Sequence, residues 1–146
     1  MKINEFFVSQ EFVDPTTYQR FGDSAIWFID QRVIDGITAI RKALNLPITV
    51  NNWHKGGQFK YRGFRPKECT EGAEMSQHRY GRATDVEVIG MTPQQLYQWI
   101  LDNWVRLKLY LYFTTLEDIA FTAGWVHIDN RNTGIVMLNG PLIVRP

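Results

Sequence analysis

The sequence contains a single cysteine, Cys69, so no disulfide can form within the chain. It also has almost no charge excess, because 16 basic and 15 acidic residues give a formal net charge of +1 at pH 7. A long uncharged apolar run is missing too, and a membrane-spanning helix needs about 18 such residues or more. These absences argue against a disulfide-stapled fold, a nucleic-acid partner and insertion into a membrane.

The first residues lack the three parts of a secretory signal peptide, which are a positively charged start, an unbroken apolar segment and a small-residue cleavage site. Acidic residues instead lie among the apolar ones at this end, for example Glu5 and Glu11. We therefore expect synthesis in the cytoplasm without a signal peptide, so that any action outside the cell depends on another export route.

Length and composition predict one folded domain. A chain of 146 residues can bury about 70% of the surface that it exposes when unfolded. Its 45% hydrophobic and 14% aromatic content lies well outside the disordered class. We expect residues 1–146 to form a single domain, with the aromatic-rich residues 1–29 as an arm packed onto the body. A ligand-binding surface is the alternative role for those aromatic side chains.

Local patterns predict helices first and a strand-rich last third. Capping residues, proline at the first helical position and apolar residues at helical spacing predict helices over residues 14–22, 30–45 and 92–106. Alternating or β-rich runs predict strands over residues 48–50, 85–88, 107–113, 116–121, 125–129, 135–138 and 142–144. This order favours an α+β domain with a mostly antiparallel sheet.

A motif that follows a long loop points to a metal site. The loop covers residues 51–75, and a loop of this length in a compact domain is usually functional or disordered. His78 and Asp85 offer an imidazole and a carboxylate, which both bind metals, and Gly81 allows a tight turn between them. The whole motif is Ser76-x-His78-x-x-Gly81-x-Ala83-x-Asp85.

His127 supplies a third donor from another alternating run, residues 125–129. Two histidines and one aspartate without a fourth protein ligand describe a catalytic zinc site, since the open coordination position can hold water. Asp129 follows His127 by two residues and therefore lies on the same face of a strand. Two roles stay open for it, orienting a metal ligand or anchoring Arg131.

These motifs resemble those of the D-Ala-D-Ala carboxypeptidase and Hedgehog-type zinc peptidases, a superfamily that includes cell-wall carboxypeptidases, dipeptidases and phage endolysins. The resemblance rests on the stretch from Ser76 to Asp85 combined with Trp125-Val-His127, and it covers most of the chain. It implies the fold of that superfamily, a small and mostly antiparallel sheet with helices packed on one side.

The resemblance also implies roles for the matched residues. His78, Asp85 and His127 would be the zinc ligands. Arg65 stands where the superfamily has a loop arginine, and it would hold a carbonyl or carboxylate oxygen of the substrate through its fork of donors.

The general base departs from the superfamily pattern. Members usually carry a glutamate a few residues before the last histidine, and residues 121–126 contain no acid. The nearest acids upstream are Glu117 and Asp118, which strand alternation would place on opposite faces. We expect Glu117 to be the base, with a wider turn after it than is usual.

The function implied by the resemblance is that of a zinc metallopeptidase. It would hydrolyse an amide bond next to a D-amino acid in peptidoglycan stem peptides, in carboxypeptidase or endopeptidase mode. A small form without a signal peptide is typical of a phage or prophage endolysin or virion component that acts in cell-wall degradation. The alternative is a non-catalytic, zinc-bearing domain that binds cell-wall peptide or a protein partner, and the displaced base keeps this alternative open.

Other residues near the motifs have more than one possible role. His54 is a pocket residue, a substitute ligand or an ordinary loop histidine. Ser76 is expected to fix the motif loop through its hydroxyl group. Trp125 and Tyr80 either wall the cleft or pack against the body.

Overall fold

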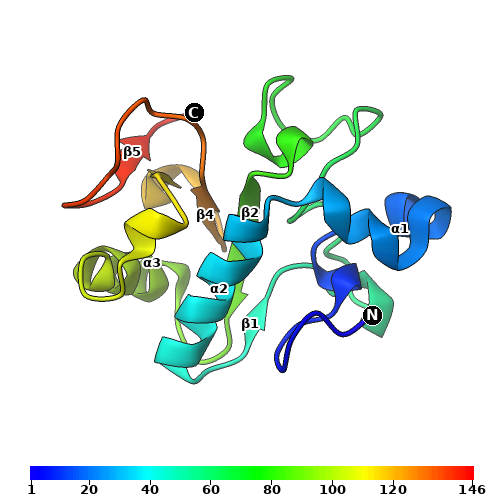
Figure 1. Cartoon of the computed structure of the whole chain (residues 1–146), viewed down its shortest axis with the longest axis horizontal. Coiled ribbons are helices and arrows are strands. Elements are labelled where there is room, and N and C mark those ends of the chain that lie inside the picture. The colour runs from blue at the N-terminus through cyan, green and yellow to red at the C-terminus, as the bar shows by residue number, and fades with distance from the viewer.

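A computed structural model describes all residues from 1 to 146 and contains three α-helices and one five-stranded sheet (Figure 1). The helices are α1 (Pro15–Phe21), α2 (Gln31–Leu44) and α3 (Pro93–Asn103). The strands are β1 (Ile48–Thr49), β2 (Ala83–Val88), β3 (Thr115–Glu117), β4 (Val126–Asp129) and β5 (Leu142–Val144). None of the helices has the length and apolar character needed to cross a lipid bilayer. The chain is therefore an α+β domain, as its sequence predicts.

The strands lie in the order β1-β2-β4-β3-β5 across the sheet. Every pair is antiparallel except β3 and β5, which run parallel with Thr115 opposite Leu142. The sheet is therefore mixed and mostly antiparallel. Its two central strands, β2 and β4, pair in a register that places Asp85 directly opposite His127. This register brings together two donors that are far apart in the sequence.

The two longer helices begin at the capping residues that the sequence indicates. The side chain of Asp30 accepts a hydrogen bond from the backbone N–H of Arg32 (3.0 Å) and starts α2. Thr92 and Gln95 form a reciprocal capping box at the start of α3, where each side chain accepts from the other's backbone N–H. Local sequence chemistry therefore fixes where both helices start.

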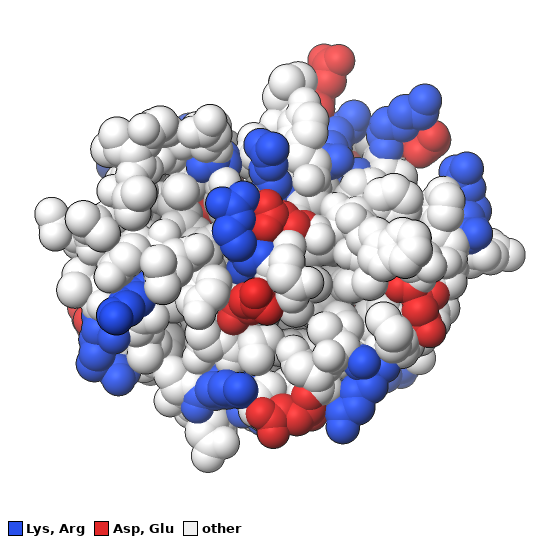
Figure 2. Space-filling view, in the orientation of Figure 1, with Lys and Arg blue, Asp and Glu red and all other residues white.

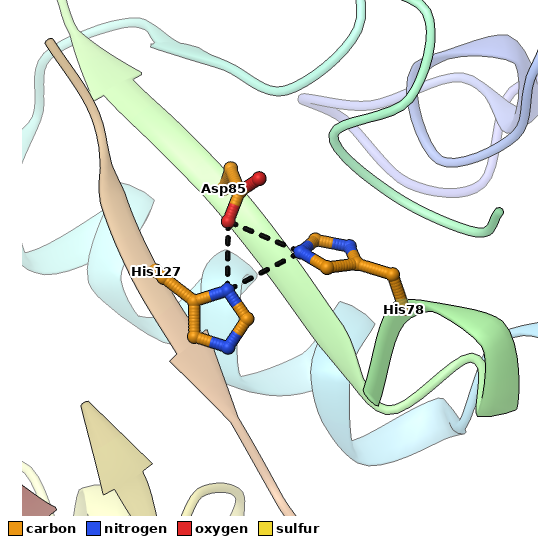
Figure 3. A group of neighbouring side chains, drawn as sticks. All are labelled: His78, Asp85 and His127. Atoms are coloured by element: carbon orange, nitrogen blue, oxygen red, sulfur yellow. Dashed lines mark hydrogen bonds and ion pairs between the residues drawn. The ribbon is translucent and has the colours of Figure 1, made fainter. Parts of the chain in front are cut away.

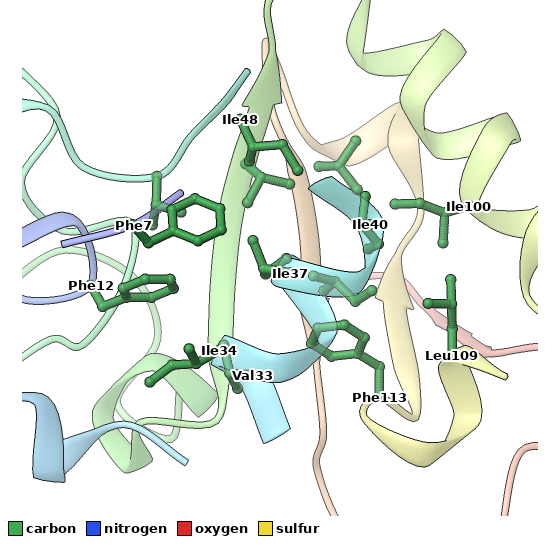
Figure 4. Close-up of a cluster of buried hydrophobic side chains, with 14 of the residues drawn as sticks. Phe7, Phe12, Val33, Ile34, Ile37, Ile40, Ile48, Ile100, Leu109 and Phe113 are labelled. Atoms are coloured by element: carbon green, nitrogen blue, oxygen red, sulfur yellow. The ribbon is translucent and has the colours of Figure 1, made fainter. Parts of the chain in front are cut away.

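Strand alternation divides the sheet into an apolar face and a polar face. Val126 and Ile128 of β4 belong to the buried hydrophobic cluster that also contains Ile37 of α2 and Ile100 of α3. Figure 4 shows Ile37 and Ile100 within this cluster. Both helices therefore cover the same face of the sheet. His127 lies between the two core residues of β4 and points to the opposite face, away from the helices.

Two predicted strands are wrong, and the first covers residues 107–113. Residues 107–113 form turns and a 3-10 helix, Leu109–Leu111, that begins after Lys108 in the left-handed conformation (φ 52°). Leu109 and Phe113 are both fully buried and join the core. A strand would place Leu111 on the same face as these two residues, but Leu111 is 57% exposed, so the run does not follow strand alternation.

The second wrong strand is the one predicted over residues 135–138, and two boundaries also differ from the sequence prediction. The strand expected over residues 116–121 ends at Glu117, because Asp118 caps a 3-10 turn by accepting from the N–H of Ala120 (3.0 Å). The strand expected over residues 135–138 is an irregular segment. The helix expected to reach residue 106 ends at Asn103. In each place a local turn interrupts an apolar pattern that extends further in the sequence.

The N-terminal arm packs onto the body through only some of its aromatic side chains. Phe7 and Phe12 are buried in the core, as expected for packing residues. Trp27 is 82% exposed, so the packing prediction is wrong for this residue. Phe28 is partly exposed and stacks on Phe64 of the long loop, with ring centroids 5.2 Å apart.

Gly81 joins this arm to the metal motif. Its φ is +67°, and a Cβ atom there would lie 1.8 Å from the carbonyl oxygen of Phe28. Its own carbonyl accepts a hydrogen bond from the N–H of Asp30 (2.9 Å). The chain therefore needs glycine here both for the turn and for the close contact with the arm.

We expect Gly81→Ala to lower the free energy of unfolding by roughly 2 to 5 kcal/mol, since a left-handed alanine and a clash with backbone each cost a few kcal/mol. Urea denaturation measures the change. Gly90→Ala is the matched control, because Gly90 also has a positive φ (+92°) but has open space around a Cβ. Equal losses in the two variants would show that the contact with Phe28 contributes nothing.

Candidate metal centre

Three buried side chains converge on one point at the polar face of the sheet (Figure 3). His78 comes from the 3-10 turn Gln77–Tyr80, Asp85 from β2 and His127 from β4. Oδ1 of Asp85 lies 3.1 Å from Nε2 of His78 and 2.8 Å from Nδ1 of His127, and these two nitrogens are 3.2 Å apart. The three donor atoms are close enough together to hold one metal ion.

Hydrogen bonds on the far side of each ring orient both histidines. Nδ1 of His78 lies 2.7 Å from the carbonyl oxygen of Gly63, and Nε2 of His127 lies 3.0 Å from Oδ2 of Asp129. Because these acceptors require N–H donors, the remaining nitrogen of each neutral ring presents a lone pair to the shared point. The histidine pair is thus set up to bind a cation rather than merely to pack.

Asp129 has both of the roles that the sequence leaves open. It is completely buried. Besides its contact with His127, its carboxylate accepts hydrogen bonds from the backbone N–H of Arg131 and from the guanidinium group of the same residue. The aspartate therefore orients a metal ligand and anchors Arg131 at once.

We expect Asp129→Asn to lower the affinity for zinc by roughly 10- to 100-fold, because loss of a carboxylate behind a metal-binding histidine typically costs that much. Isothermal titration calorimetry with zinc measures the affinity. Asp102→Asn, on the exposed side of α3, is the control and should leave it unchanged. An unchanged affinity in a folded Asp129→Asn variant would remove this residue from the metal centre.

The site is strongly charged when it holds no metal. Burial disfavours a charge on His127, but its hydrogen bonds to Asp129 and Asp85 outweigh burial and raise the pKa of His127 to about 9. Burial likewise disfavours the carboxylate of Asp85, yet His78 and His127 hold the pKa of Asp85 far below its usual range. At neutral pH the metal-free centre therefore holds an imidazolium group beside a carboxylate.

Zinc binding is expected to release a proton from His127 at neutral pH, since a metal ligand must be a neutral imidazole. With a pKa of about 9, His127 is a protonated imidazolium below that pH and a neutral imidazole above it. The apparent affinity should therefore rise with pH, by up to about tenfold per unit, and level off near the pKa. Calorimetry in buffers of different ionisation enthalpy counts the protons. Zinc binding without proton release would contradict the charge state described above.

Arg65 and Glu117 lie in the same cleft as the three donors. The cleft has a volume of about 510 Å³ and is lined by all five site residues that the sequence predicts, which are Arg65, His78, Asp85, Glu117 and His127. Oε2 of Glu117 lies 3.9 Å from Nδ1 of His127. Nη2 of Arg65 lies 3.2 Å from Oδ2 of Asp85, and its Nε donates to the carbonyl of Tyr61 (2.7 Å).

The long loop holds this arginine in place. The N–H of Arg65 donates to the carbonyl of His78 (3.1 Å), and the N–H of Asp85 donates to the carbonyl of Arg62 (2.8 Å). Arg62 in turn pairs with Glu87 on β2. The loop is therefore tied to the motif and to β2 through Arg62 and Arg65, and Arg65 lines the cleft.

The C-terminal segment also lines the cleft, and sequence reasoning missed it. Val144, Arg145 and Pro146 face the cavity because β5 pairs in parallel with β3 and so ends beside Glu117. Arg145 is held by Asp118, whose Oδ2 lies 3.0 Å from its Nε. Parallel pairing between distant short strands leaves no local pattern, so no sequence signal marks these residues.

The structure also places the remaining residues that the sequence singles out near the motifs. His54 lies outside the donor cluster and is not a substitute ligand. Oγ of Ser76 accepts from the backbone N–H of His78 (3.4 Å), which is the positioning role expected for its hydroxyl. Trp125 lines the cleft, whereas Tyr80 does not and is 49% exposed.

The chain matches no protein-family model, no curated protein and no solved structure. Support for a function therefore comes from two sources, the geometry of this centre and the resemblance of its motifs. The geometry stands independently of the resemblance, because the three donors meet in the fold whatever family the chain belongs to.

Proposed function

We propose that the protein is a zinc-dependent peptidase that hydrolyses an amide bond next to a D-amino acid in peptidoglycan stem peptides. The observation that carries the proposal is the convergence of His78, Asp85 and His127 in a cleft that also contains Glu117. A metal centre with an acid beside it, open to a peptide-sized cavity, has the parts that amide hydrolysis requires.

The donor set supports zinc as the ion. Zinc binds imidazole nitrogen and carboxylate oxygen at about 2.0 to 2.2 Å, so donors arranged tetrahedrally around it lie about 3.3 Å apart. The three separations here, 2.8, 3.1 and 3.2 Å, are close to that value. Three protein ligands without a fourth are typical of catalytic rather than structural zinc sites.

A zinc ion held by these residues supplies activation of water at neutral pH and polarisation of a carbonyl group. The chain's own contribution to proton transfer falls to Glu117, whose carboxylate lines the cleft. In this proposal Glu117 accepts the proton of the attacking water and then delivers it to the leaving amine. No covalent bond between the chain and the substrate is needed.

Arg65 is proposed to hold the substrate oxygen that becomes negatively charged. Two of its donor groups are engaged by Tyr61 and Asp85, which fix the guanidinium plane. The remaining N–H donors can face a carbonyl or carboxylate oxygen in the cleft. Because Arg65 is held in position before substrate binds, its guanidinium group does not have to move during the reaction.

The biological setting follows from the resemblance alone. We propose a phage or prophage endolysin, or a virion component, that acts on the bacterial cell wall. The substrate partner in either case is the stem peptide.

A non-catalytic zinc domain that binds cell-wall peptide or a protein partner is the second candidate. It is favoured by the position of Glu117, which comes from β3 rather than from the residues just before His127. Its Oε2 is 3.9 Å from Nδ1 of His127, beyond hydrogen-bond distance. If Glu117 cannot reach the attacking water, the metal centre binds a peptide or protein partner without hydrolysing it.

Mass spectrometry of purified muropeptides after incubation with zinc-loaded protein tests the proposal. Cleavage of a stem-peptide amide bond, with a new amine and a new carboxylate, is the expected result. The chelator-treated protein is the control and should leave the muropeptides intact. Intact muropeptides after incubation with fully zinc-loaded protein would favour the binding domain instead.

A further inference from the structure

A second cavity, here called the side pocket, opens beside the metal cleft. Its volume is about 270 Å³. Four residues line both cavities, and they are Arg65, Glu71, Asp85 and Trp125. One of the four, Asp85, is a donor of the metal centre. The side pocket therefore adjoins the metal cleft at the metal centre itself.

The metal cleft lies over a row of residues that crosses the sheet. Asp85 of β2 stands opposite His127 of β4, and Glu117 of β3 stands opposite Val144 of β5. The 3.9 Å approach of Glu117 to His127 joins the two pairs. Neighbouring strands are about 4.8 Å apart, so the row is roughly 14 Å long. The metal centre occupies the β2 end of the row, and the cleft extends from there across β3 to β5.

The side pocket lies along the other edge of β2. The N–H of Asp85 donates to the carbonyl of Arg62 (2.8 Å), and because β4 occupies one edge of β2, this bond places the long loop at the opposite edge. Residues 58–62 of that loop line the side pocket and not the metal cleft, whereas Glu117 and Val144 line the metal cleft and not the side pocket. The metal centre therefore lies between two arms of one groove, the side pocket and the part of the cleft over β3 and β5, here called the cleft arm.

Three aromatic side chains of the side pocket are not used by the hydrophobic core. Phe59, Tyr61 and Trp125 are half-buried and line the pocket, and none of them belongs to the core cluster or packs against it. The guanidinium carbon of Arg62 lies 3.4 Å from the ring centre of Phe59 and 6.0 Å from the ring of Trp125. Large aromatic side chains usually contribute their area to a core or to an interface. These three rings are therefore available to a ligand.

Charge does not dominate the side pocket. Arg62 and Arg65 are paired with Glu87 and Asp85, at 3.2 Å in each case. Basic and acidic side chains are also interspersed on the face of the molecule seen in Figure 2. Neither place has the concentrated positive charge that a nucleic acid or another polyanion requires. Aromatic faces with paired charges between them suit a peptide segment instead.

The position of Glu117 sets the direction of such a peptide. In the proposed reaction Glu117 delivers a proton to the leaving amine, so the segment released with that amine lies in the cleft arm. From β4 this arm crosses β3 to β5, a distance of about 10 Å, which an extended peptide covers in roughly three residues. The cleft arm is therefore longer than the single residue that a carboxypeptidase removes.

We propose that the groove binds a peptide on both sides of the metal centre, with one segment in the cleft arm and the other against Phe59 and Trp125 in the side pocket. The consequence rests on the proposed function: the protein cuts inside the stem peptide, as an endopeptidase, and does not remove its last residue. Water adds across the amide bond, leaving a carboxylate on the segment in the side pocket and an amine on the segment in the cleft arm.

Mass spectrometry of a synthetic, N-acetylated stem pentapeptide after incubation with zinc-loaded protein distinguishes the two modes. The expected result is a released carboxyl-terminal fragment of at least two residues that carries the new amine. Release of the last residue alone would overturn the endopeptidase proposal and leave the peptidase proposal standing.

Amide NMR of the metal-free protein tests binding without any reaction. The pentapeptide is expected to shift the signals of Phe59 and Tyr61 in the side pocket together with those of Glu117 and Val144 in the cleft arm. D-alanyl-D-alanine is the comparison, because this dipeptide is too short for both arms and should leave the side-pocket signals in place. Pentapeptide shifts confined to one arm would overturn the proposal.

Phe59→Ala is expected to weaken binding of the pentapeptide by roughly tenfold, since aromatic side chains that line a binding site often contribute that much. The variant should fold, because Phe59 does not pack against the core. Phe121→Ala is the matched control, since Phe121 is 52% exposed and lines neither cavity. Equal pentapeptide affinities in the Phe59→Ala and wild-type proteins would contradict a role for the side pocket.

Failure of the groove and failure of the peptidase proposal give different results. If the zinc-loaded protein cuts neither muropeptides nor the pentapeptide, the peptidase proposal fails. The NMR titration, which needs no metal and no hydrolysis, then still decides whether the groove binds peptide on both sides of the centre.

Discussion

The Glu117→Gln variant is expected to bind zinc as tightly as the wild type and to cut muropeptides roughly 100 to 10,000 times more slowly, which is the usual contribution of a general base. Glutamine has nearly the same shape as glutamate but cannot accept a proton at neutral pH. Glu117 is not among the three convergent donors, so the metal centre should stay intact. Zinc content is measured by elemental analysis and cleavage by mass spectrometry.

Asp118→Asn is the matched control for this variant. Asp118 is the next residue in the chain, but it caps a 3-10 turn and pairs with Arg145 instead of lining the cleft. The control should cut muropeptides at a rate close to that of the wild type. If Glu117→Gln cuts as fast as the wild type, another group acts as the base, and the position of Glu117 in the cleft has no catalytic meaning.

The His127→Ala variant is expected to lose zinc, with an affinity reduced by well over 100-fold. Loss of a group behind a ligand already costs about 10- to 100-fold, and loss of the ligand itself must cost more. Only two donors, His78 and Asp85, are left in this variant. Titration calorimetry with zinc and elemental analysis after dialysis both measure the effect.

His54→Ala provides the control for histidine replacement. His54 lies in the loop outside the donor cluster, and neither of its ring nitrogens has a hydrogen-bond partner. Its replacement should leave zinc affinity and stoichiometry unchanged. If His127→Ala retains wild-type affinity while folded, the ion is held elsewhere and the centre described here is not the metal site.

Sequence patterns predict the residues of the metal site more accurately than they predict the strands. His78 and Asp85 are found from a spaced motif, whose geometry is local because the turn at Gly81 and the strand at Asp85 form from nearby residues. His127 is found from the alternating run over residues 125–129. What the sequence cannot state is the register of β2 against β4, which places Asp85 opposite His127. That register depends on side chains packed across the sheet, and it becomes visible only in the fold.

The wrong strand over residues 107–113 shows why apolar runs are ambiguous. Leu109 and Phe113 fit alternation and helical spacing equally well, and burial in the core decides between them. The approach of Arg145 to the cleft was equally hidden, since it depends on the parallel pairing of β5 with β3. Long-range packing overrides local pattern at both places.

The most direct test of the metal centre is a crystal structure of the zinc-loaded protein with anomalous data at the zinc edge. The predicted result is one zinc ion coordinated by Nε2 of His78, Nδ1 of His127 and Oδ1 of Asp85, the three atoms that now face one another. An anomalous peak at any other place in the molecule, with these three side chains bound to nothing in common, would contradict it.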